Sequence, residues 1–414
     1  MLIEIQYKVA SLLVYQGVFQ NPIGRAFTEF IEGGSVPEAL KAYGKWFTAL
    51  ADKNQSWSDF LIEQIVLDDN PFSRQVQTAE LTDISPSLLL ATKHDLSILQ
   101  ELYRLTPAHF IQGITVEGEN TIELPDWQVE NRSDSFLHSS ENWTESLDRL
   151  ASYYREKGTG IFAQYRAFRW REGTLQGIPS PDPIDIAEIV GYDSPKEMLL
   201  KNTEFLLSGY PALNVLLYGS RGSGKSSLVK GLLQKYSERG LRLIEVAKSE
   251  LKDLPIIVDR LRDLPRKFII FVDDLSFEED DEAFKALKVV LEGSVTARPR
   301  NVVVYATSNR RHLVREFFGD RPRPIEGEEL HTWDTVQEKL SFSDRFGLTL
   351  TFEPADQEKY LAIIHHLAGL AGLEIEREDL EFRAKQWATR HNGRSGRTAR
   401  QFIDFLTGEA RGSR

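Results

Sequence analysis

Residues 214–233 read NVLLYGSRGSGKSSLVKGLL, and this stretch decides the fold. It begins with an apolar run typical of a buried strand, continues through a glycine-rich loop and ends in a helical pattern. Gly219, Gly222 and Gly224 permit backbone conformations closed to other residues, so consecutive amides can turn toward one phosphate at the start of the helix. A strand-to-helix turn that binds nothing is the alternative, but the full GxxxxGKS spacing after a strand favours a phosphate-binding loop.

The residues of this loop have distinct roles in the predicted site. Lys225 would add a cation beside the β- and γ-phosphates, and Ser226 would give its hydroxyl oxygen to Mg²⁺. We therefore expect ATP and Mg²⁺ as ligands. The predicted nucleotide-binding residues of the loop are Gly219, Ser220, Arg221, Gly222, Ser223, Gly224, Lys225, Ser226 and Ser227.

A second motif, KFIIFVDD at residues 267–274, is an apolar strand that ends in two aspartates. Asp273 could hold Mg²⁺ through a water molecule, and Asp274 could orient or activate the attacking water. A pair of solvated acids at the end of a strand is the alternative. Together with the glycine-rich loop, the motif predicts an Mg²⁺-dependent ATPase.

Beyond residue 184, short β-branched runs alternate with helical segments, which predicts an α/β fold with a parallel sheet and helices on both faces. After Pro354 the helical spacing of Tyr360, Ile363, Ile364 and Leu367 predicts a small helical domain, the lid. The predicted strands are NVLLYG, LRLIEVA, KFIIFVDD, NVVVYATS and LTLTFE.

The rest of the chain divides by the same patterns. Residues 1–170 are mostly helical in pattern, because apolar residues recur at intervals of three and four, and we expect this N-terminal domain to recognise a partner. A stretch rich in glycine and proline at 171–184 predicts a linker. The α/β core then spans 185–353 and the lid 354–414.

Composition narrows the class of protein. With 414 residues and 41% hydrophobic residues, the chain can bury more than one core. It has no run of about 18 apolar residues and no pattern of an N-terminal signal peptide, so we expect a cytoplasmic protein without a membrane span. The absence of cysteine excludes disulfides and thiolate chemistry, and the net charge of -12 argues against wholesale polyanion binding.

Four further segments resemble the AAA+ ATPases, in the order that this family has them. IAEIVGYD, with Ile189, Val190 and Gly191, is similar to the segment that packs on the adenine ring. VVVYATSN ends in Asn309, which looks like sensor 1, whose polar side chain reaches the γ-phosphate or the attacking water. Asp274 departs from the pattern, since it is one methylene shorter than the glutamate usual there.

The other two segments carry arginines. In KLSFSDRFGLTLTFEPAD, Arg345 resembles the arginine that projects toward the ATP of a neighbouring subunit, which implies a homo-oligomer of undetermined subunit number. A salt-bridged surface arginine is the alternative. In SGRTARQFIDFL, Arg400 is the first candidate for sensor 2 at the start of a lid helix, and Arg397 is the second.

The wording of five segments further resembles the bacterial AAA+ family known as domain of unknown function 815, over about residues 140–408. That resemblance implies an ATPase fold and no established substrate. The paired aspartates and the segment SDRFG also resemble the initiator and helicase-loader side of AAA+ proteins, which is an analogy at fold level. The five segments are FVDDLSFE, LEGS, YATSNRRHLV, SDRFG and RSGRTARQFID.

Three other features bear on partners. No aromatic-apolar-glycine pore loop occurs in residues 248–266, which argues against peptide threading. EEDDE at 278–282 is read as a solvated helix start rather than a second magnesium site, and His365 with His366 lacks a third ligand for a metal. An arginine-rich stretch predicts surface and subunit-interface arginines, with nucleic acid phosphates or an acidic partner face as the alternative, and comprises Arg298, Arg300, Arg310, Arg311, Arg315, Arg321 and Arg323.

The sequence thus predicts an ATPase that couples hydrolysis to the remodelling of an unidentified protein or nucleic-acid partner. Two alternatives stay open. A nucleotide-gated binding module with slow turnover follows from the short side chain of Asp274, and a DNA-associated initiator or loader follows from the arginines.

Overall fold

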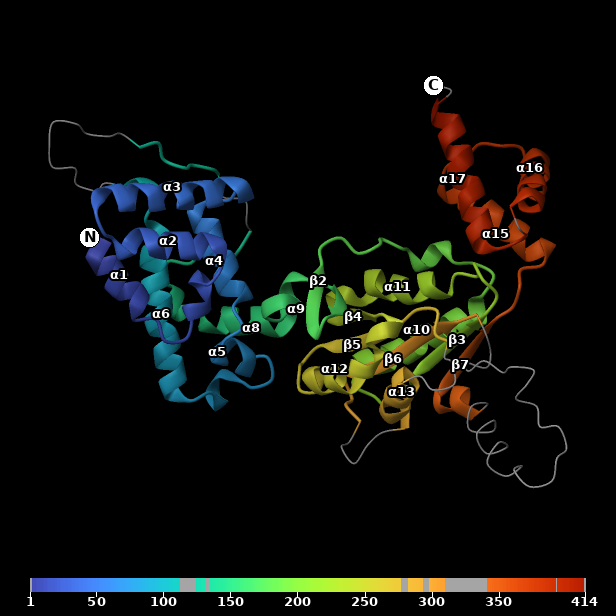
Figure 1. Ribbon diagram of the computed structural model, residues 1–414, viewed down its shortest axis with the longest axis horizontal. Helices are drawn as coiled ribbons and strands as arrows, with labels where there is room; N and C mark the ends of the chain where they lie inside the picture. The colour runs from blue at the N-terminus through green and yellow to red at the C-terminus, as the bar shows by residue number, and fades with distance from the viewer. Residues whose placement is uncertain are drawn as a thin grey trace. The chain divides into compact units, whose positions relative to one another are not determined.

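The computed structural model describes residues 2–111, 124–130, 134–276, 282–292, 298–309, 341–391 and 393–412. The chain divides into two compact units, Met1–Gln164 and Tyr165–Arg414. Figure 1 traces the helices and strands of both units. Among the residues just given, no helix is both long and apolar enough to span a bilayer.

The described residues of the first unit form α-helices and short 3₁₀ helices. Side chains of Asn21, Ser56 and Asn70 accept hydrogen bonds from the first turns of α2, α4 and α5, so polar caps fix where these helices begin. The helices are α1 (Leu2–Ala10), η1 (Gln16–Phe19), α2 (Pro22–Glu32), α3 (Val36–Lys53), α4 (Trp57–Leu67), α5 (Pro71–Gln75), η2 (Leu81–Asp83), α6 (Pro86–Arg104), α7 (Pro107–Ile111), η3 (Trp143–Glu145), α8 (Leu147–Lys157) and α9 (Gly160–Gln164).

An aromatic cluster forms the core of this unit. Trp46 of α3 is fully buried, and its ring lies 5.3 Å from Phe27, 5.0 Å from Trp57 and 5.5 Å from Phe110, measured between centroids. Large rings of this kind bury much apolar surface each and therefore contribute strongly to stability. The predicted helical character of the N-terminal region is confirmed.

The second unit combines a sheet with helices. Its strands are β1 (Ala167–Arg171), β2 (Thr174–Ile178), β3 (Val215–Gly219), β4 (Leu241–Val246), β5 (Lys267–Val272), β6 (Val302–Ser308) and β7 (Leu348–Phe352). Its helices are η4 (Ile186–Glu188), α10 (Asp193–Leu207), α11 (Lys225–Tyr236), η5 (Ser237–Arg239), η6 (Lys248–Asp253), α12 (Leu254–Leu261), α13 (Glu282–Glu292), η8 (Ser341–Arg345), α15 (Gln357–Leu370), α16 (Arg377–Arg390) and α17 (Gly396–Gly412).

The sheet has the strand order β2-β1-β4-β5-β6-β3-β7, and every neighbouring pair is parallel except β1 with β2. All five predicted strands are present as β3 to β7. Figure 1 shows α11 on one side of the sheet and α12 and α13 on the other, so the predicted α/β fold class is confirmed. Because β3, β5 and β6 run in parallel, their carboxyl ends meet at one edge of the sheet.

The predicted linker at 171–184 is wrong over its first half, which contains strand β2. Arg171 pairs with Thr174 across a two-residue turn, and both turn residues have positive φ, 51° at Glu172 and 72° at Gly173. This is the turn geometry that suits the twist of a hairpin. Gly177 lies within β2 and does not interrupt it. An added Cβ at this position would come within 2.1 Å of the Tyr165 ring, so glycine allows the ring to pack closely against the strand.

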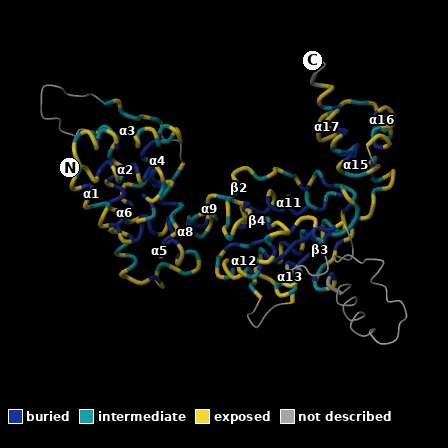
Figure 2. Tube along the Cα trace, viewed as in Figure 1, coloured by how far each residue is buried: buried dark blue, intermediate teal, exposed yellow. Residues whose placement is uncertain are grey.

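The C-terminal helices α15, α16 and α17 pack around one small core, as predicted for the lid. Tyr360, Ile363, Ile364 and Leu367 of α15 are all buried there, against residues of the other two helices. Figure 2 shows this buried line along α15 and the exposed outer faces of α16 and α17. The helical periodicity that predicted the lid therefore marks its core face.

One half-buried carboxylate in the first unit lies in surroundings that disfavour its charge. Asp68 follows α4, and its Oδ2 accepts a hydrogen bond of 2.7 Å from Asn70 Nδ2. The backbone of Gly17 packs so closely that an added Cβ would meet Asp68 Oδ1 at 2.2 Å. Burial raises the pKa of Asp68 to about 6, while the hydrogen bond from Asn70 acts in the opposite direction.

The variant Asp68→Asn should therefore change stability in a pH-dependent way. Because the folded pKa lies above the unfolded value of 3.8, the proton on Asp68 contributes stability that is complete below about pH 4 and is lost as pH rises through 6. We expect Asp68→Asn to gain roughly 2 kcal/mol relative to wild type between pH 4 and pH 7.5. Thermal unfolding of the full chain at a series of pH values measures this, with exposed Asp52→Asn as the control. A stability difference that stays constant with pH would contradict the expectation.

Candidate functional site

The glycine-rich loop between β3 and α11 turns under a close backbone contact with β7. Gly219 has a φ of 138°, and an added Cβ would lie 2.0 Å from the carbonyl oxygen of Phe352. The next amide, that of Ser220, donates a hydrogen bond of 2.9 Å to the same oxygen. Only glycine fits at this position, and the contact fixes how the loop leaves the sheet.

Lys225 lies at the first turn of α11, with its side chain folded into the loop. Its Nζ donates to the carbonyl oxygens of Gly219 at 3.0 Å and Ser220 at 2.7 Å, and it lies 3.3 Å from Asn309 Oδ1. Burial lowers the pKa of Lys225, although the charges of Asp273 and Asp274 act against this. Among the described residues, neutral oxygens are its hydrogen-bonding partners. A buried cation at a helix N-terminus, whose hydrogen bonds go to neutral oxygens, fits an anion such as a phosphate.

Two hydroxyls converge on one carboxylate oxygen beside this lysine. Ser226 Oγ donates to Asp273 Oδ1 at 2.6 Å, and Thr307 Oγ1 donates to the same atom at 2.5 Å. Ser226 comes from α11, Asp273 follows β5 and Thr307 is on β6, so three elements supply hard oxygen atoms at one point. A hydroxyl and a carboxylate at hydrogen-bonding distance are the donor set that suits Mg²⁺ held by few protein ligands.

Asp274 has an unusual backbone conformation that its neighbours hold. Its φ is 52°, in the left-handed region that aspartate and asparagine enter more readily than other non-glycine residues. Its amide donates to Thr307 Oγ1 at 3.0 Å, and the next amide, of Leu275, donates to the Thr307 carbonyl at 2.7 Å. Asn309 Nδ2 donates to Asp274 Oδ1 at 2.7 Å, which aims the carboxylate toward the lysine side of the site.

The lid touches the loop through backbone atoms. The amide of Arg397, at the start of α17, donates to the Gly222 carbonyl at 3.1 Å. An added Cβ on Gly222 would meet Ser395 and Arg397 at 2.9 to 3.2 Å, and one on Gly396 would lie 3.0 Å from Gly222 O. Glycine at both positions allows this approach. Arg400 of the same helix forms an ion pair with Glu188.

The segment predicted to face the adenine ring connects core and lid. Ile189 is buried, and its carbonyl accepts a hydrogen bond of 3.0 Å from Lys196 Nζ. Val190 packs against the lid core. Gly191 has a φ of 79°, and an added Cβ would meet the Lys359 side chain at 2.9 Å. The three residues thus stand where the core, the loop and the lid come together.

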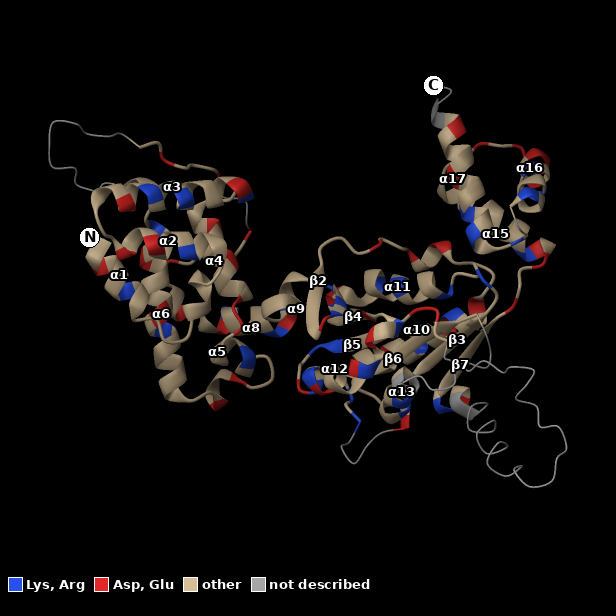
Figure 3. Cartoon of the chain, in the orientation of Figure 1, with Lys and Arg blue, Asp and Glu red and all other residues tan. Residues whose placement is uncertain are grey.

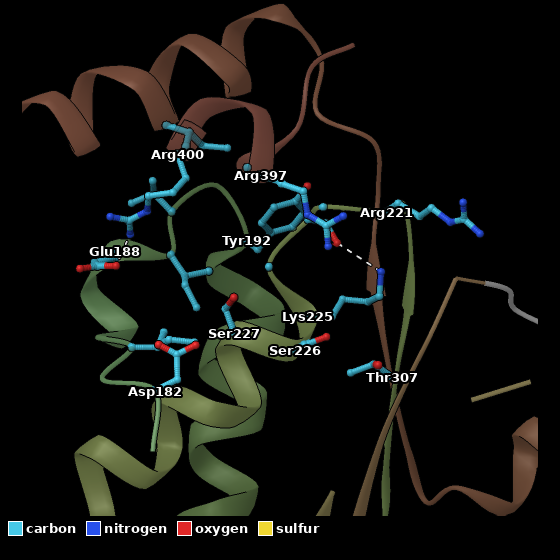
Figure 4. Close-up of a pocket in the computed structure, with 18 of the residues that line it drawn as sticks. Asp182, Glu188, Tyr192, Arg221, Lys225, Ser226, Ser227, Thr307, Arg397 and Arg400 are labelled. Atoms are coloured by element: carbon cyan, nitrogen blue, oxygen red, sulfur yellow. Dashed lines mark hydrogen bonds and ion pairs between the residues drawn. The ribbon is translucent and has the colours of Figure 1, made fainter. Parts of the chain in front are cut away.

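These elements enclose a cleft of about 920 Å³, which is within the size range of small-molecule and cofactor sites. Figure 4 shows Arg397 and Arg400 on the lid side, across from Lys225, Ser226 and Ser227, whereas Arg221 points away from them. Arg345 does not line the cleft. Cleft-lining residues from the predicted site are Ile189, Val190, Arg221, Gly222, Ser223, Gly224, Lys225, Ser226, Ser227, Asp273, Asp274, Asn309, Arg397 and Arg400.

The predicted arginines outside the cleft have partners in their own chain. Arg345 ends η8, and its guanidinium pairs with Glu292 of α13. Arg298 Nη2 donates to Asn214 Oδ1 at 2.9 Å and to the Ala212 carbonyl at 3.1 Å, and burial lowers the pKa of Arg298. Arg300 is exposed. The remaining five arginines of the stretch fall in residues 310–340, which, like most of EEDDE, lie outside the described residues.

The histidines of the lid make ordinary contacts. His365 Nε2 lies 2.9 Å from Glu381 Oε1, and His366 Nε2 lies 2.8 Å from the Ala187 carbonyl. No cluster of three or more histidine and acidic side chains suited to a metal occurs in the part of the chain that the structure describes.

Sequence reasoning missed Thr307, Glu188 and Tyr192. Thr307 lies within the quoted run VVVYATSN, two residues after Tyr305. It is a polar residue near the end of the strand next to the aspartate strand, and this position could have identified it. Glu188 and Tyr192 lie within IAEIVGYD, on either side of the three residues singled out there, and line the cleft. Tyr192 OH donates to the Glu353 carbonyl at 2.9 Å, and its ring lies under Lys359 Nζ at 4.7 Å.

Comparisons with known proteins add a family. A family model described as "Protein of unknown function (DUF815)" matches residues 163–410, which contain all seven strands and nearly all of the lid. The curated proteins give no match. Among solved structures, RuvB, the Holliday junction branch migration motor of Thermotoga maritima, is 17% identical over 54% of this chain and 72% of its own, with a TM-score of 0.33. AMPPCP-bound DnaA from Aquifex aeolicus is 16% identical over 55% of this chain and 66% of its own, with a TM-score of 0.37.

The contact between Gly219 and Phe352 predicts a sharp difference between two glycines of positive φ. Gly219→Ala should lower the free energy of unfolding of the second unit by about 3 kcal/mol or more, because backbone strain and a clash with β7 add. Gly209 has a φ of 78° and nothing within 4 Å of an added Cβ, so Gly209→Ala should cost about 1 kcal/mol from strain alone. Urea unfolding of both variants followed by circular dichroism makes the comparison. Equal losses would show that the β7 contact does not constrain the loop.

Proposed function

The chain belongs to the family described as Protein of unknown function (DUF815), and from its AAA+-type fold and its cleft we propose that it binds ATP with Mg²⁺ and hydrolyses it to ADP and phosphate. The observation that carries this proposal is the buried ammonium of Lys225. It lies at the start of α11 with neutral oxygen partners, beside the hydroxyls and the carboxylate of Ser226, Thr307 and Asp273. A phosphate chain would supply the charge that this cation lacks.

The chain's own residues divide the binding among them. The backbone amides from Ser220 to Ser226 would bind the phosphates, and Lys225 would shift from the loop carbonyls to a phosphate oxygen. Ser226 and Asp273 would hold Mg²⁺, which when bound polarises the phosphate and neutralises part of its charge. On the other side of the cleft, Ile189 and Val190 offer apolar surface for the base.

Hydrolysis requires a group that orients water and accepts its proton. Asp274 is the candidate, since it lines the cleft and one of its carboxylate oxygens accepts a hydrogen bond from Asn309. Asn309 also lies 3.3 Å from Lys225 Nζ, so this amide connects the proposed base with the phosphate-binding cation. Arg397 and Arg400 enter the cleft from the lid, where a cation could stabilise charge on the phosphates.

Arg345 is proposed to act on a neighbouring copy of the chain. Arg345 does not line the cleft of its own chain, and its guanidinium pairs with Glu292 at the end of α13. Supplying this cation from a second subunit would make hydrolysis depend on a homo-oligomer. We further propose that lid movement on hydrolysis remodels a cytoplasmic partner that residues 1–170 recognise, with 185–353 as the motor core and 354–414 as the lid.

A second candidate function is a nucleotide-gated binding module with slow turnover. The conformation of Asp274 favours it, because the short carboxylate is held by Asn309 in a strained backbone. The two functions differ in turnover and not in binding.

Hydrolysis measured against protein concentration tests the proposal. Specific activity should rise with concentration, fall at least about a hundredfold in Lys225→Ala and about a thousandfold in Arg345→Ala, since a cation at the transition state is worth several kcal/mol. Glu292→Gln is the matched control, because it removes the ion pair with Glu292 and keeps Arg345, and exposed Arg300→Ala controls for charge. Activity that is independent of concentration and unchanged in Arg345→Ala would exclude the role of Arg345. Tight ATP binding without turnover in wild type would favour the binding module.

The backbone at residue 274 makes a second prediction. Asp274→Glu should not increase turnover, although glutamate reaches further, because a longer side chain tolerates a φ of 52° less well. Asp274→Asn keeps the conformation and removes the base, so turnover should fall about a hundredfold or more while ATP binding persists. Single-turnover hydrolysis and equilibrium binding with both variants separate these effects. A faster Asp274→Glu enzyme would mean that reach, and not backbone conformation, limits the rate.

A further inference from the structure

The net charge of the chain resides almost entirely in its first unit. Residues 1–164 contain 12 Lys and Arg against 23 Asp and Glu, a formal charge of -11. Residues 165–414 contain 38 against 39, a formal charge of -1. Figure 3 marks in red the acidic residues on the helices of the first unit. An acidic surface of this kind attracts basic partners and repels nucleic acid.

The first unit also contains a cavity of about 800 Å³. The end of α3, the helices α4 and α8, and residues 134–136 form its walls. Its floor is apolar and its rim is polar. Lining residues are Lys53, Asn54, Gln55, Asp59, Ile62, Glu63, Val66, Asp134, Ser135, Phe136 and Tyr153.

The wall at 134–136 is firmly anchored, so the cavity is a built feature. Leu137 is fully buried, and its carbonyl accepts a hydrogen bond of 2.9 Å from Trp143 Nε1. His138 Nε2 lies 3.0 Å from Asp59 Oδ1, and His138 Nδ1 lies 2.9 Å from Tyr103 OH. This chain of contacts ties the segment to α4 and α6.

The floor and rim offer two kinds of surface side by side. Ile62 and Val66 are buried and line the cavity together with the rings of Phe136 and Tyr153, whose centroids lie 6.4 Å apart. Glu63 stands at the rim, where Gln55 Nε2 donates to it at 2.6 Å. Within the described part of the chain, the carboxylate of Asp134 and the hydroxyl of Tyr153 have no hydrogen-bonding partner, so both are available to a ligand.

One ring of the aromatic wall already carries a guanidinium of the same chain. The guanidinium carbon of Arg149 lies 4.6 Å from the centre of the Phe136 ring. A planar guanidinium stacks on an aromatic face and pairs with carboxylates in a way that an ammonium does not. Three acids, Asp59, Glu63 and Asp134, face one cation, Lys53, in the cavity lining. With the ring of Tyr153 and the apolar floor, this excess of negative charge favours a long side chain that ends in a guanidinium.

We propose that this cavity binds an arginine side chain that a partner protein presents next to an apolar residue. The guanidinium would lie between Glu63 and Asp134, and the aliphatic stem and the neighbouring residue would cover Ile62 and Val66. The site recognises the partner and is separate from the nucleotide cleft, so it stands or falls independently of ATP hydrolysis.

Methyl NMR of the full chain tests the site directly, because Ile62 and Val66 report from the floor. The probe is the dipeptide N-acetyl-Leu-Arg-amide, with the citrulline and lysine analogues in parallel titrations. We expect saturable shifts of both methyl signals with the arginine probe, binding about tenfold weaker with neutral citrulline, and intermediate binding with lysine. No saturable shift, or equal affinity for arginine and citrulline, would overturn the proposal.

Charge variants supply the control. Glu63→Gln with Asp134→Asn removes both rim charges and should weaken arginine binding about tenfold while leaving the citrulline probe unaffected. Glu32→Gln with Asp83→Asn makes the same change in net charge at exposed positions outside the cavity and should leave binding unchanged. Equal weakening in both pairs would mean that the probe responds to overall charge, and the site would be rejected. Unchanged circular dichroism spectra and thermal unfolding of both double variants confirm that the fold is intact.

Discussion

The nucleotide cleft depends on one oxygen atom, Oδ1 of Asp273, which accepts hydrogen bonds from Ser226 and Thr307. Those two hydroxyls come from the helix after β3 and from β6, so a single carboxylate ties the loop helix to two strands. The parallel sheet makes this possible because the carboxyl ends of β3, β5 and β6 lie at one edge. Thr307 also accepts a hydrogen bond from the backbone amide of Asp274, and the Asp274 carboxylate accepts one from Asn309. Loop, metal-side carboxylate and proposed base are thus positioned by one connected network.

The sequence predicts the parts of this site that local patterns encode. The glycine-rich loop, the two aspartates and Asn309 each follow an apolar strand, and a parallel sheet brings such strand ends together. The sequence could not predict the left-handed conformation of Asp274, because it arises from a hydrogen bond to Thr307 on another strand. The same holds for the contact of Arg397 with Gly222 and for Arg400 with Glu188, which join segments far apart in the chain. The β1–β2 hairpin lies where glycine and proline content predicts a linker, because Gly173 occupies the turn and Gly177 lets the Tyr165 ring pack against the strand.

The two units differ in chemistry. The second unit is nearly neutral and gathers a buried cation, hard oxygen ligands and lid arginines around one cleft. The first unit holds almost all of the net charge and a cavity with an acidic rim over aromatic and aliphatic walls. The proposed nucleotide chemistry and the proposed partner recognition therefore belong to separate cores, one formed by aromatic packing and the other by the sheet. An arginine-bearing partner suits the first unit, while a phosphate chain suits the second.

The most direct test of the nucleotide site is calorimetric titration of ATP into the full chain with and without Mg²⁺, in wild type and Lys225→Ala. One ATP should bind per chain, Mg²⁺ should strengthen binding, and Lys225→Ala should weaken it by about two orders of magnitude, since the phosphates lose their buried cation. Absence of ATP binding at millimolar concentration, or equal binding by wild type and Lys225→Ala, would contradict the assignment of this cleft to a nucleotide.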